Sequence, residues 1–394
     1  WYRLQFDAAP GFSGAERNSR MLLHFGAVDW QAAVYLNQAL LGNHTGGYDG
    51  FSFDVTDSLR SAGNELLVRV FDPSNDGAQP NGKQRISALD SPGGDTYSPN
   101  SGIWQTVWLE AVPAKYIRSL KIDQASRDTV TVSADIAGGG PVSFVVLDGS
   151  RALASASGKA GQAVAIRVPS PKAWSPDSPH LYDLKVTAGD DEVLSYFGLR
   201  TFELVQTAAL LGNGTARPML NGEFTFMAGF LDQSWWPDGQ YTAPTDDALA
   251  YDLQATKMFG LNMIRLHQKI NPERWYYHAD RLGLVVFQDL VQKYGGASKA
   301  TVELFVGDMR AAITGRRNHP CIVQWTTFNE GDCWRVFNTK PYNVEGITKL
   351  AKELDPTRLV DTDSGGPANN FHLADVNDIH SYPYPGNPQP SHTQ

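Results

Sequence analysis

The stretch that decides the fold is His319-Pro320-Cys321-Ile322-Val323-Gln324-Trp325-Thr326-Thr327-Phe328-Asn329-Glu330. It has the composition of a short apolar strand, and its last two residues, Asn329 and Glu330, are an amide and a carboxylic acid. A buried strand with polar residues at its C-terminal end is how a parallel α/β barrel presents catalytic groups at its mouth. We therefore expect Glu330 to lie at the mouth of a (β/α)8 barrel.

Strands and helices are expected to alternate on both sides of this run. The expected helices are residues 245–259, 272–282, 300–316 and 344–354, and the expected strands are residues 224–230, 262–266, 284–289, 322–329, 359–363 and 378–380. We interpret Asn271 as the N-cap of the second helix, with Pro272 in its first position and Gly283 as its stop. Repeated strand–helix alternation predicts a parallel sheet. The count corresponds to about six of the eight strands of a barrel, and we expect the last two to lie beyond Gln394.

The chain before the barrel is expected to consist of strands. Residues 1–112 contain short alternating runs separated by turns rich in Gly, Asn, Asp and Pro, which predicts a jelly-roll β-sandwich whose N-terminus is truncated. Residues 113–205 have the strand spacing of an immunoglobulin-like sandwich. Residues 206–394 then form the incomplete barrel. Within the first unit, residues 74–100 form a long loop, and such loops are usually either mobile or functional.

The composition excludes several classes of partner. The chain has 394 residues, 42% of them hydrophobic, a formal net charge of −9 and a pI near 5.5. This acidity argues against a nucleic-acid partner, and the apolar runs are too short to span a membrane. Because His, Asp, Glu and Cys occur without metal-ligand spacing, we expect no metal site. The sequence leaves the oligomeric state and the compartment open, and a secreted or periplasmic location is compatible with it.

An Asn beside a Glu at a barrel mouth suits the hydrolysis of glycosides. The Glu can protonate the leaving oxygen, and the Asn can hydrogen-bond a sugar hydroxyl. A retaining glycosidase needs a second carboxylate roughly 5–5.5 Å from the first. We interpret the downstream Asp361 and Asp363 as pocket or structural groups, and Asp332 as too close in sequence to Glu330 to face it across a barrel.

An ordered set of motifs resembles glycoside hydrolase family 2, the group of β-galactosidases, β-glucuronidases and β-mannosidases. The motifs are residues 34–37, 42–48, 51–56 and 102–109 in the first sandwich, residues 174–176, 179–182 and 197–200 in the second, and Asn221-Gly222 and Asn329-Glu330 in the barrel. The resemblance covers essentially the whole chain. It implies a sugar-binding-type jelly roll, an immunoglobulin-like domain and a catalytic barrel, whose chemistry needs no organic cofactor.

The resemblance implies the central catalytic role for Glu330. This residue would be the acid/base at the end of strand 4, and Asn329 would contact the sugar 2-hydroxyl. The nucleophile of the family is a Glu at the end of strand 7, for which we find no position in the chain. The structural alternative for Glu330 is an ordinary strand-end Glu that pairs with an Arg.

Five further residues match the pocket of the family. By this resemblance Arg265, on strand 2, would lie near the nucleophile and hold it ionised. His267 and Asp289, at the ends of strands 2 and 3, would line the sugar pocket. His380 and Tyr382 would lie beyond strand 6, with the Tyr phenol within reach of the nucleophile. The structural alternatives are a salt bridge inside the barrel for Arg265 and backbone hydrogen bonds for His267 and Asp289.

Tryptophans near the barrel strands are candidates for stacking on a sugar ring. Trp334 is the best of them because it follows Glu330 closely. Trp235 and Trp236 are the others. Large aromatic side chains are more often core or domain-interface residues.

The sequence therefore predicts a retaining exo-β-glycosidase of the β-galactosidase or β-glucuronidase type, acting on a carbohydrate. The alternative is a non-catalytic carbohydrate-binding or scaffold protein with the same fold, because a fold does not fix a function. An endo-acting enzyme would need an open cleft in place of a pocket. The sequence does not distinguish the sugar or the linkage.

Overall fold

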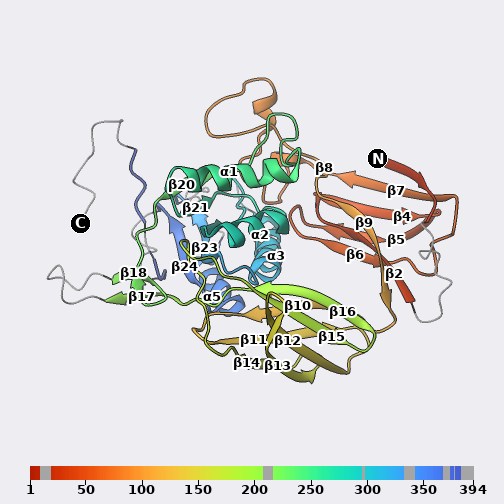
Figure 1. The fold of residues 1–394 in the computed structure, drawn as a ribbon. Helices are drawn as coiled ribbons and strands as arrows, with labels where there is room; N and C mark the ends of the chain where they lie inside the picture. Colours follow the sequence, from red (N-terminus) through yellow and green to blue (C-terminus); the bar gives the residue numbers. More distant parts are fainter. Residues whose placement is uncertain are drawn as a thin grey trace.

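The computed structural model describes residues 1–8, 19–206, 216–294, 298–331, 342–366, 373–376 and 378–382. Two β-sandwiches and one α/β unit follow each other along the chain. In the view of Figure 1 the first sandwich lies to the right of the α/β unit, and the second lies below it. This arrangement confirms the expected fold class.

The first sandwich has two antiparallel sheets, of strand order β1-β7-β4-β5 and β6-β2-β9, and a short β3–β8 pair. The strands are β1 (Tyr2–Phe6), β2 (Ser19–Phe25), β3 (Val28–Asp29), β4 (Gln31–Leu36), β5 (Ala39–Thr45), β6 (Phe51–Asp54), β7 (Asn64–Phe71), β8 (Gly102–Ile103) and β9 (Val107–Pro113). Alternate residues of β4 and β7 are buried, as in a sheet with one face on a core. The segment between β7 and β8 carries two 3-10 turns, η1 (Ser74–Asp76) and η2 (Ile86–Leu89).

The second sandwich packs a sheet of order β10-β11-β14 against one of order β13-β12-β15-β16. Its strands are β10 (Ile117–Asp123), β11 (Thr129–Ile136), β12 (Pro141–Asp148), β13 (Arg151–Lys159), β14 (Val164–Arg167), β15 (Tyr182–Ala188) and β16 (Asp191–Phe197). Strand β13 was not expected from the sequence, because its alternating Ala and Ser residues lack the large β-branched and aromatic side chains that indicate a strand.

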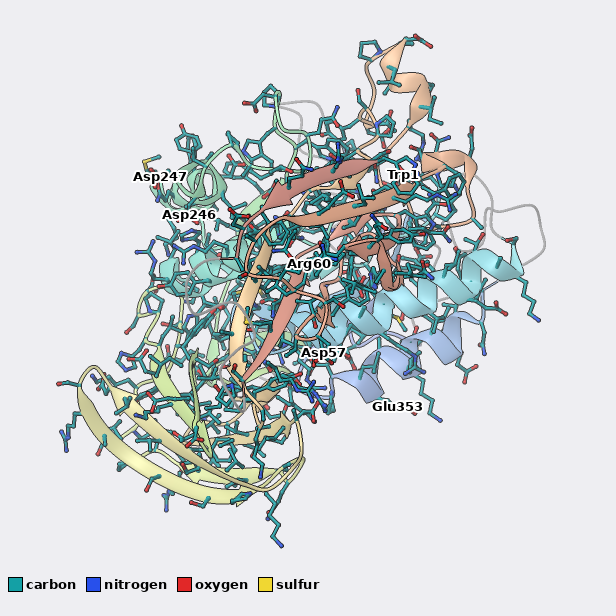
Figure 2. The ribbon with its side chains drawn as sticks, turned by 90° about the vertical axis from the view of Figure 1, so that its right-hand side faces the viewer. Trp1, Asp57, Arg60, Asp246, Asp247 and Glu353 are labelled. Carbon is teal, nitrogen blue, oxygen red and sulfur yellow. The ribbon has the colours of Figure 1, made fainter. Side chains whose placement is uncertain are left out.

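The α/β unit is a five-stranded parallel sheet of order β20-β21-β22-β23-β24. Its strands are β20 (Gly229–Asp232), β21 (Met263–Leu266), β22 (Val285–Asp289), β23 (Ile322–Asn329) and β24 (Leu359–Ser364), and the helices are α1 (Asp246–Met258), α2 (Glu273–Leu282), α3 (Lys299–Arg316) and α5 (Val344–Leu354). The first turn of α1 carries Asp246 and Asp247, which are exposed (Figure 2). A hairpin precedes the sheet, formed by β17 (Phe202–Gln206), β18 (Ala216–Leu220) and β19 (Glu223–Phe224). The predicted strand–helix alternation is confirmed, and all residues of β23 are buried.

Three local predictions are wrong. The strand expected at residues 224–230 is two pieces, since Phe224 ends the hairpin and the first barrel strand begins only at Gly229. The N-cap of α2 is Pro272 and not Asn271, whose side-chain amide donates to Ser234 Oγ instead. Residues 378–380 form no strand; before them, Asp361 and Val376 form an isolated parallel bridge, and the Asp375 N–H donates to the carbonyl of Val360 at 2.9 Å.

The second sandwich is fixed to the barrel just before β23. Nη2 of Arg200, which is fully buried, donates to the carbonyl of Ile322 at 2.6 Å. Asn318 accepts a hydrogen bond from the Ile122 N–H at 2.8 Å and donates to the Leu120 carbonyl at 2.8 Å. Because these bonds act on the start of β23 and the segment before it, the sandwich holds the strand that leads to Glu330.

The first sandwich is fixed to the barrel by a buried lysine that follows β21. Nζ of Lys269 donates to the carbonyls of Ser234 at 2.7 Å and Tyr241 at 2.8 Å. It lies over the rings of Trp104, Trp236 and Tyr241, with centroid distances of 5.3, 5.1 and 4.6 Å. Burial lowers the pKa of Lys269 to about 7. Trp104 belongs to the first sandwich, so this contact joins the two units.

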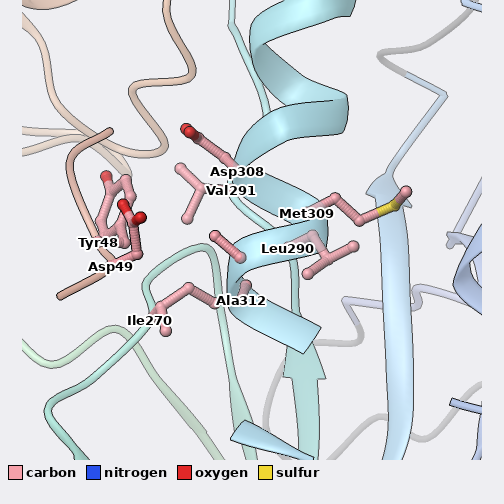
Figure 3. A pocket seen from close by; sticks show the side chains of 9 residues that line it. Tyr48, Asp49, Ile270, Leu290, Val291, Asp308, Met309 and Ala312 are labelled. Atoms are coloured by element: carbon pink, nitrogen blue, oxygen red, sulfur yellow. The ribbon is translucent and has the colours of Figure 1, made fainter. Parts of the chain in front are cut away.

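A small cavity lies in the same interface (Figure 3). Tyr48 and Asp49 line it from the first sandwich, and Asp308 and Met309 line it from α3. Burial raises the pKa of Asp308 well above its usual value, and the charge of Asp49 adds to this effect. The cavity is therefore a feature of the domain interface. Among the described residues, no helix is long and apolar enough to cross a membrane.

Candidate active site

Glu330 stands at the carboxyl end of the buried strand β23. Its backbone has a positive φ of 53°, a conformation that costs a non-glycine residue roughly 1–2 kcal/mol. The Glu330 N–H donates to the carbonyl of Ser364, at the end of β24, at 2.7 Å. This bond helps to hold the strained turn. Strain of this kind collects at functional sites, where the surrounding structure maintains it.

The carboxylate of Glu330 is hydrogen-bonded by two residues that follow the described strands. Nδ1 of His380 lies 2.7 Å from Oε1 of Glu330, and the Tyr382 hydroxyl donates to the same oxygen at 2.8 Å. The hydrogen bond from His380 lowers the pKa of Glu330, burial opposes the shift, and Tyr382 adds to the lowering. The phenol of Tyr382 was expected near the nucleophile, and it lies on Glu330.

Arg265, on β21, connects most of the candidate residues. Its guanidinium donates to both oxygens of Asp289, the shortest distance being 2.7 Å from Nη2 to Oδ2. The same Nη2 donates to Oδ1 of Asn329 at 2.9 Å. Nη1 lies 3.1 Å from Nε2 of His380. Burial disfavours the charge of Arg265, but the charge and hydrogen bonds of Asp289, together with the charges of Asp378 and Asp361, outweigh it and raise the pKa of Arg265.

The contact with Arg265 bears on the protonation of His380. A guanidinium can only donate, so Nε2 of a neutral His380 accepts from Arg265 and its Nδ1–H donates to Glu330. Nε2 also lies 2.9 Å from Oγ of Ser364 and 3.7 Å from Oδ2 of Asp378. The nearby carboxylate of Asp378 raises the pKa of His380, although burial opposes it. His380 is thus placed to gain or lose a proton beside Glu330.

Asp289, at the end of β22, is the buried anion behind Arg265. Its side chain is 2% exposed, and Nδ1 of His267 lies 2.5 Å from its Oδ2. Burial opposes its charge, but Arg265 and then His267 outweigh that effect and lower the pKa of Asp289. Asp289 and His267 were both expected at the ends of their strands, and the structure pairs them there beside Arg265.

Three polar residues of the site were not expected from the sequence. Oε1 of Gln292 accepts from the Asn329 N–H at 3.1 Å. Ser364 donates to Asp378 at 2.6 Å, and Asp378 also accepts from the Gly365 N–H at 2.6 Å. Ser364 is the last residue of β24, so its position at a strand end was a usable signal. Gln292 and Asp378 lie outside regular elements and carried no such signal.

The two downstream carboxylates have separate environments. Burial, followed by the charges of Asp378 and Asp289, raises the pKa of Asp361 well above its usual value, which favours its protonated form. Oδ1 of Asp363 accepts from the Gly331 N–H at 3.0 Å, which ties β24 to the turn after Glu330. Asp332 lies outside the described residues.

The tryptophans do not form a stacking platform among the described residues. Trp235 stacks on Tyr97 of the first sandwich, with ring centroids 4.7 Å apart, and Trp236 packs over Lys269. Both therefore serve the domain interface. Trp334, the best candidate from the sequence, lies outside the described residues.

The long loop of the first sandwich reaches this site. The N–H groups of Asn81 and Gly82 donate to the Gln292 carbonyl at 3.3 and 3.0 Å, and Gln292 in turn accepts from Asn329. Residues 79–84 are buried. Figure 1 shows the loop, in orange, extending from the sandwich toward the α/β unit. The site is therefore built from two structural units.

Family models match the chain in the order of its three units. The galactose-binding domain-like model of glycosyl hydrolase family 2 matches residues 1–101, the central family 2 model matches residues 112–200, and the family 2 TIM-barrel model matches residues 238–392. The chain belongs to glycoside hydrolase family 2. The resemblance inferred from the sequence motifs is thereby confirmed.

Relatives of this family 2 chain include proteins named for two activities. A protein of Formosa agariphila named "Putative beta-glucuronidase" is 27% identical over 390 residues, covering 91% of this chain and 44% of that protein. A β-galactosidase of Thermoanaerobacter pseudethanolicus is 25% identical, covering 82% of this chain and 44% of that protein. The chain thus spans less than half the length of these two curated relatives.

The fold of the family 2 chain is also found among solved structures. The β-glucuronidase of Ruminococcus gnavus in complex with uronic deoxynojirimycin superimposes with a TM-score of 0.80 at 20% identity. The match covers 97% of this chain and 67% of that structure. At this identity the likeness concerns the fold.

Proposed function

We propose that this chain supplies the acid/base side of the active site of a retaining exo-β-glycosidase. The observation that carries the proposal is the position of Glu330. It lies at the carboxyl end of a buried barrel strand, in a strained backbone conformation, with two hydrogen-bond donors on one carboxylate oxygen. The family membership and the names of the relatives support the same reaction class.

In this proposal Glu330 alternates between two protonation states. In the first step it protonates the glycosidic oxygen while a second carboxylate attacks the anomeric carbon. An ionised carboxylate nearby raises the pKa of Glu330 and favours the acid form. Once that carboxylate is esterified, the hydrogen bonds from His380 and Tyr382 favour the ionised form, which then accepts a proton from the attacking water.

Arg265 and its partners act as positioning groups. Asp289 and His267 hold the guanidinium in the barrel, and the guanidinium orients Asn329 by donating to its Oδ1. The amide nitrogen of Asn329 is then directed away from that bond and can donate to a sugar hydroxyl. We propose that the nucleophile comes from a strand outside the described residues. We also propose residues 1–112, 113–205 and 206–394 as the bounds of the three structural units.

The proposal is tested on the full-length protein with a panel of 4-nitrophenyl β-glycosides. The panel contains the galactoside, glucuronide, mannoside and glucoside, so that the substrate that is hydrolysed identifies the sugar. Because 4-nitrophenolate leaves without a proton, Glu330→Gln is expected to act here through the second step, lowering kcat about 10²- to 10⁴-fold because the hydrolysis of the glycosyl-enzyme loses its general base. Glu353→Gln, an exposed change on α5 (Figure 2), is the matched control and should behave as wild type. If wild type hydrolyses no member of the panel, the non-catalytic carbohydrate-binding alternative is favoured.

A further inference from the structure

The loop that joins the first sandwich to the barrel mouth carries two cations, Lys83 and Arg85. They lie on one aromatic ring: Nζ of Lys83 is 5.0 Å and the guanidinium carbon of Arg85 is 4.6 Å from the ring centroid of Tyr294. Tyr294 follows β22 in the barrel, so cations from one unit meet a ring of the other. Neither cation has a part in the hydrolysis proposed for Glu330.

The loop is held in place by buried hydrogen bonds. Gln84 donates to Oδ2 of the buried Asp29 at 3.0 Å and accepts from the Asn100 N–H at 2.6 Å. Its neighbours pair with the returning strand of the loop, where the Arg85 N–H donates to the Tyr97 carbonyl at 2.8 Å. The segment is therefore a preorganised part of the first sandwich, and its cations are presented in a defined position.

A chain of hydrogen bonds connects the segment that carries Lys83 to Asn329, the neighbour of Glu330. Lys83 directly follows Gly82, which donates to the carbonyl of Gln292, and the side chain of Gln292 accepts from Asn329. The positive charge of Lys83 is also among the influences that lower the pKa of Glu330, after the hydrogen bonds of His380 and Tyr382 and the opposing effect of burial. Lys83 is thus on the Glu330 side of the site.

The partner of Lys83 is an exposed carboxylate. Nζ lies 2.6 Å from Oδ2 of Asp95, and the two side chains are 6% and 73% exposed. An ion pair with so exposed a partner contributes little stability, so Asp95 can exchange with another anion at low cost. A carboxylate or sulfate that reaches the mouth would meet a cation already desolvated by Tyr294 and the loop.

The depth of the groups indicates which part of a substrate would reach them. The side chain of Asp289 is 2% exposed and that of Arg265 is 15% exposed, whereas that of Glu330 is 37% exposed. In a pocket-type enzyme the terminal sugar occupies the deep end, and the leaving group points toward solvent from the oxygen that the acid protonates. A loop laid over the mouth on the Glu330 side therefore faces the leaving group.

We propose that Lys83 and Arg85 bind a carboxylate or sulfate on the leaving-group side of the scissile bond, so that the preferred substrates are glycosides of anionic aglycones or anionic sugars. The inference rests on the proposed function, because the acid role of Glu330 determines where the leaving group lies. The chemistry of recognition is a charge-assisted hydrogen bond from Lys83 and the positive charge of Arg85, whose Nη1 is held by the carbonyls of Gly82 and Gln84.

The test compares two substrates that share the terminal sugar found by the aryl-glycoside panel. One is the 4-methylumbelliferyl glycoside, which is neutral, and the other is the 3-carboxyumbelliferyl glycoside, which carries a carboxylate on the aglycone. The readout is the ratio of kcat/KM for the anionic substrate to kcat/KM for the neutral one. Comparing each variant through this ratio removes the changes in kcat/KM that affect both substrates equally.

Lys83→Met and Arg85→Gln are each expected to lower the ratio roughly 5- to 10-fold. Asp95→Asn removes the competing carboxylate and is expected to raise the ratio. Lys299→Gln, at a 92% exposed position on α3, is the control and should leave it unchanged. A ratio that stays at the wild-type value in Lys83→Met, or an equal loss on both substrates, overturns the inference.

A binding measurement separates this inference from the proposed function. The fluorescence of 7-hydroxycoumarin-3-carboxylate, the anionic leaving group alone, is titrated with wild type and with Lys83→Met. Weaker binding by the variant supports the anion site even if wild type hydrolyses neither glycoside, in which case only the proposed function fails. Equal binding by the two proteins overturns the anion site whether or not wild type is active.

Discussion

Nδ1 of His380 lies 2.7 Å from Oε1 of Glu330, and Nε2 of the same ring faces Arg265 at 3.1 Å. One imidazole thus connects the proposed acid/base to the buried Arg265–Asp289 ion pair. This arrangement makes the protonation of Glu330 depend on a second titratable group, whose pKa is raised by the carboxylate of Asp378. Changes to this network, and to the contacts that hold it in place, should therefore alter activity and stability.

Replacement of His380 should move the pH profile of activity. If Glu330 is the acid, kcat/KM falls as the pH rises through the pKa of Glu330. The hydrogen bond from His380 lowers that pKa, so His380→Ala should raise it and move the alkaline limb to higher pH. Tyr382→Phe should move the limb in the same direction. The control is His24→Ala, which removes an imidazole that stacks on Trp108 in the first sandwich. A limb that stays in place or moves to lower pH contradicts the assignment.

Removal of Arg265 should destabilise the barrel because it leaves a buried anion unpaired. Arg265→Met is expected to cost about 3–5 kcal/mol in the free energy of unfolding, measured with urea. Asp289→Asn in the same chain should restore part of this stability, while activity stays low because Asn329 has lost its donor. Arg274→Met breaks an ion pair whose side chains are 57% and 48% exposed, and it should cost at most about 1 kcal/mol. Equal losses of unfolding free energy in Arg265→Met and Arg274→Met would show that the buried ion pair contributes no more to stability than the exposed one.

The docking of the loop on the barrel can be tested with two glycines that share a left-handed backbone. Gly82 has φ +51°, and an added Cβ would lie 2.6 Å from the Gln268 carbonyl oxygen. Gly94 has φ +68° and open space around that position. Both alanine variants carry the backbone strain, roughly 1 kcal/mol, but only Gly82→Ala must displace the loop. We expect kcat/KM to fall roughly tenfold or more in Gly82→Ala and to stay near wild type in Gly94→Ala. The docking is disproved if the two variants have the same activity.

Stability should fall at alkaline pH through His319. Its two ring nitrogens lie 2.6 Å from Asp280 and 2.6 Å from Glu273, and although burial opposes the charge, these carboxylates raise the pKa of His319 to about 9. A histidine in the unfolded chain has a pKa of about 6.5. The stabilisation of the folded state by protonated His319 is therefore complete below pH 6.5 and is lost as the pH rises through 9. The shift corresponds to on the order of 3 kcal/mol. The stability difference between wild type and His319→Gln should therefore shrink between about pH 6.5 and 9.5 in urea unfolding, and a constant difference would contradict the account.

The sequence predicted the elements with the strongest local patterns. Strand β23 and helix α5 have the expected bounds, because a buried apolar run and a capped amphipathic segment are each bounded by clear signals. Strand β13 was missed, since Ala and Ser give little strand signal. Residues 378–380 were expected to be a strand, and they instead use their side chains to contact Ser364 and Glu330.

The candidate site was predictable only as a set of residue types at strand ends. The sequence named Glu330, Asn329, Arg265 and Asp289, and the structure brings them together in one hydrogen-bond network. It did not indicate that Lys83 would lie beside them, because Lys83 belongs to another structural unit. No local pattern reports which loop of one unit docks on the mouth of another.

The role of Glu330 is tested most directly by the dependence of hydrolysis on the leaving group. The measurement is kcat/KM of full-length wild type and Glu330→Gln on a series of aryl glycosides whose phenols differ in acidity. The account predicts a loss of about 10²- to 10⁴-fold for the least acidic phenols, shrinking steadily as the phenol becomes more acidic, because a good leaving group needs no proton. A loss of the same size for every phenol, or no loss for any of them, would contradict it.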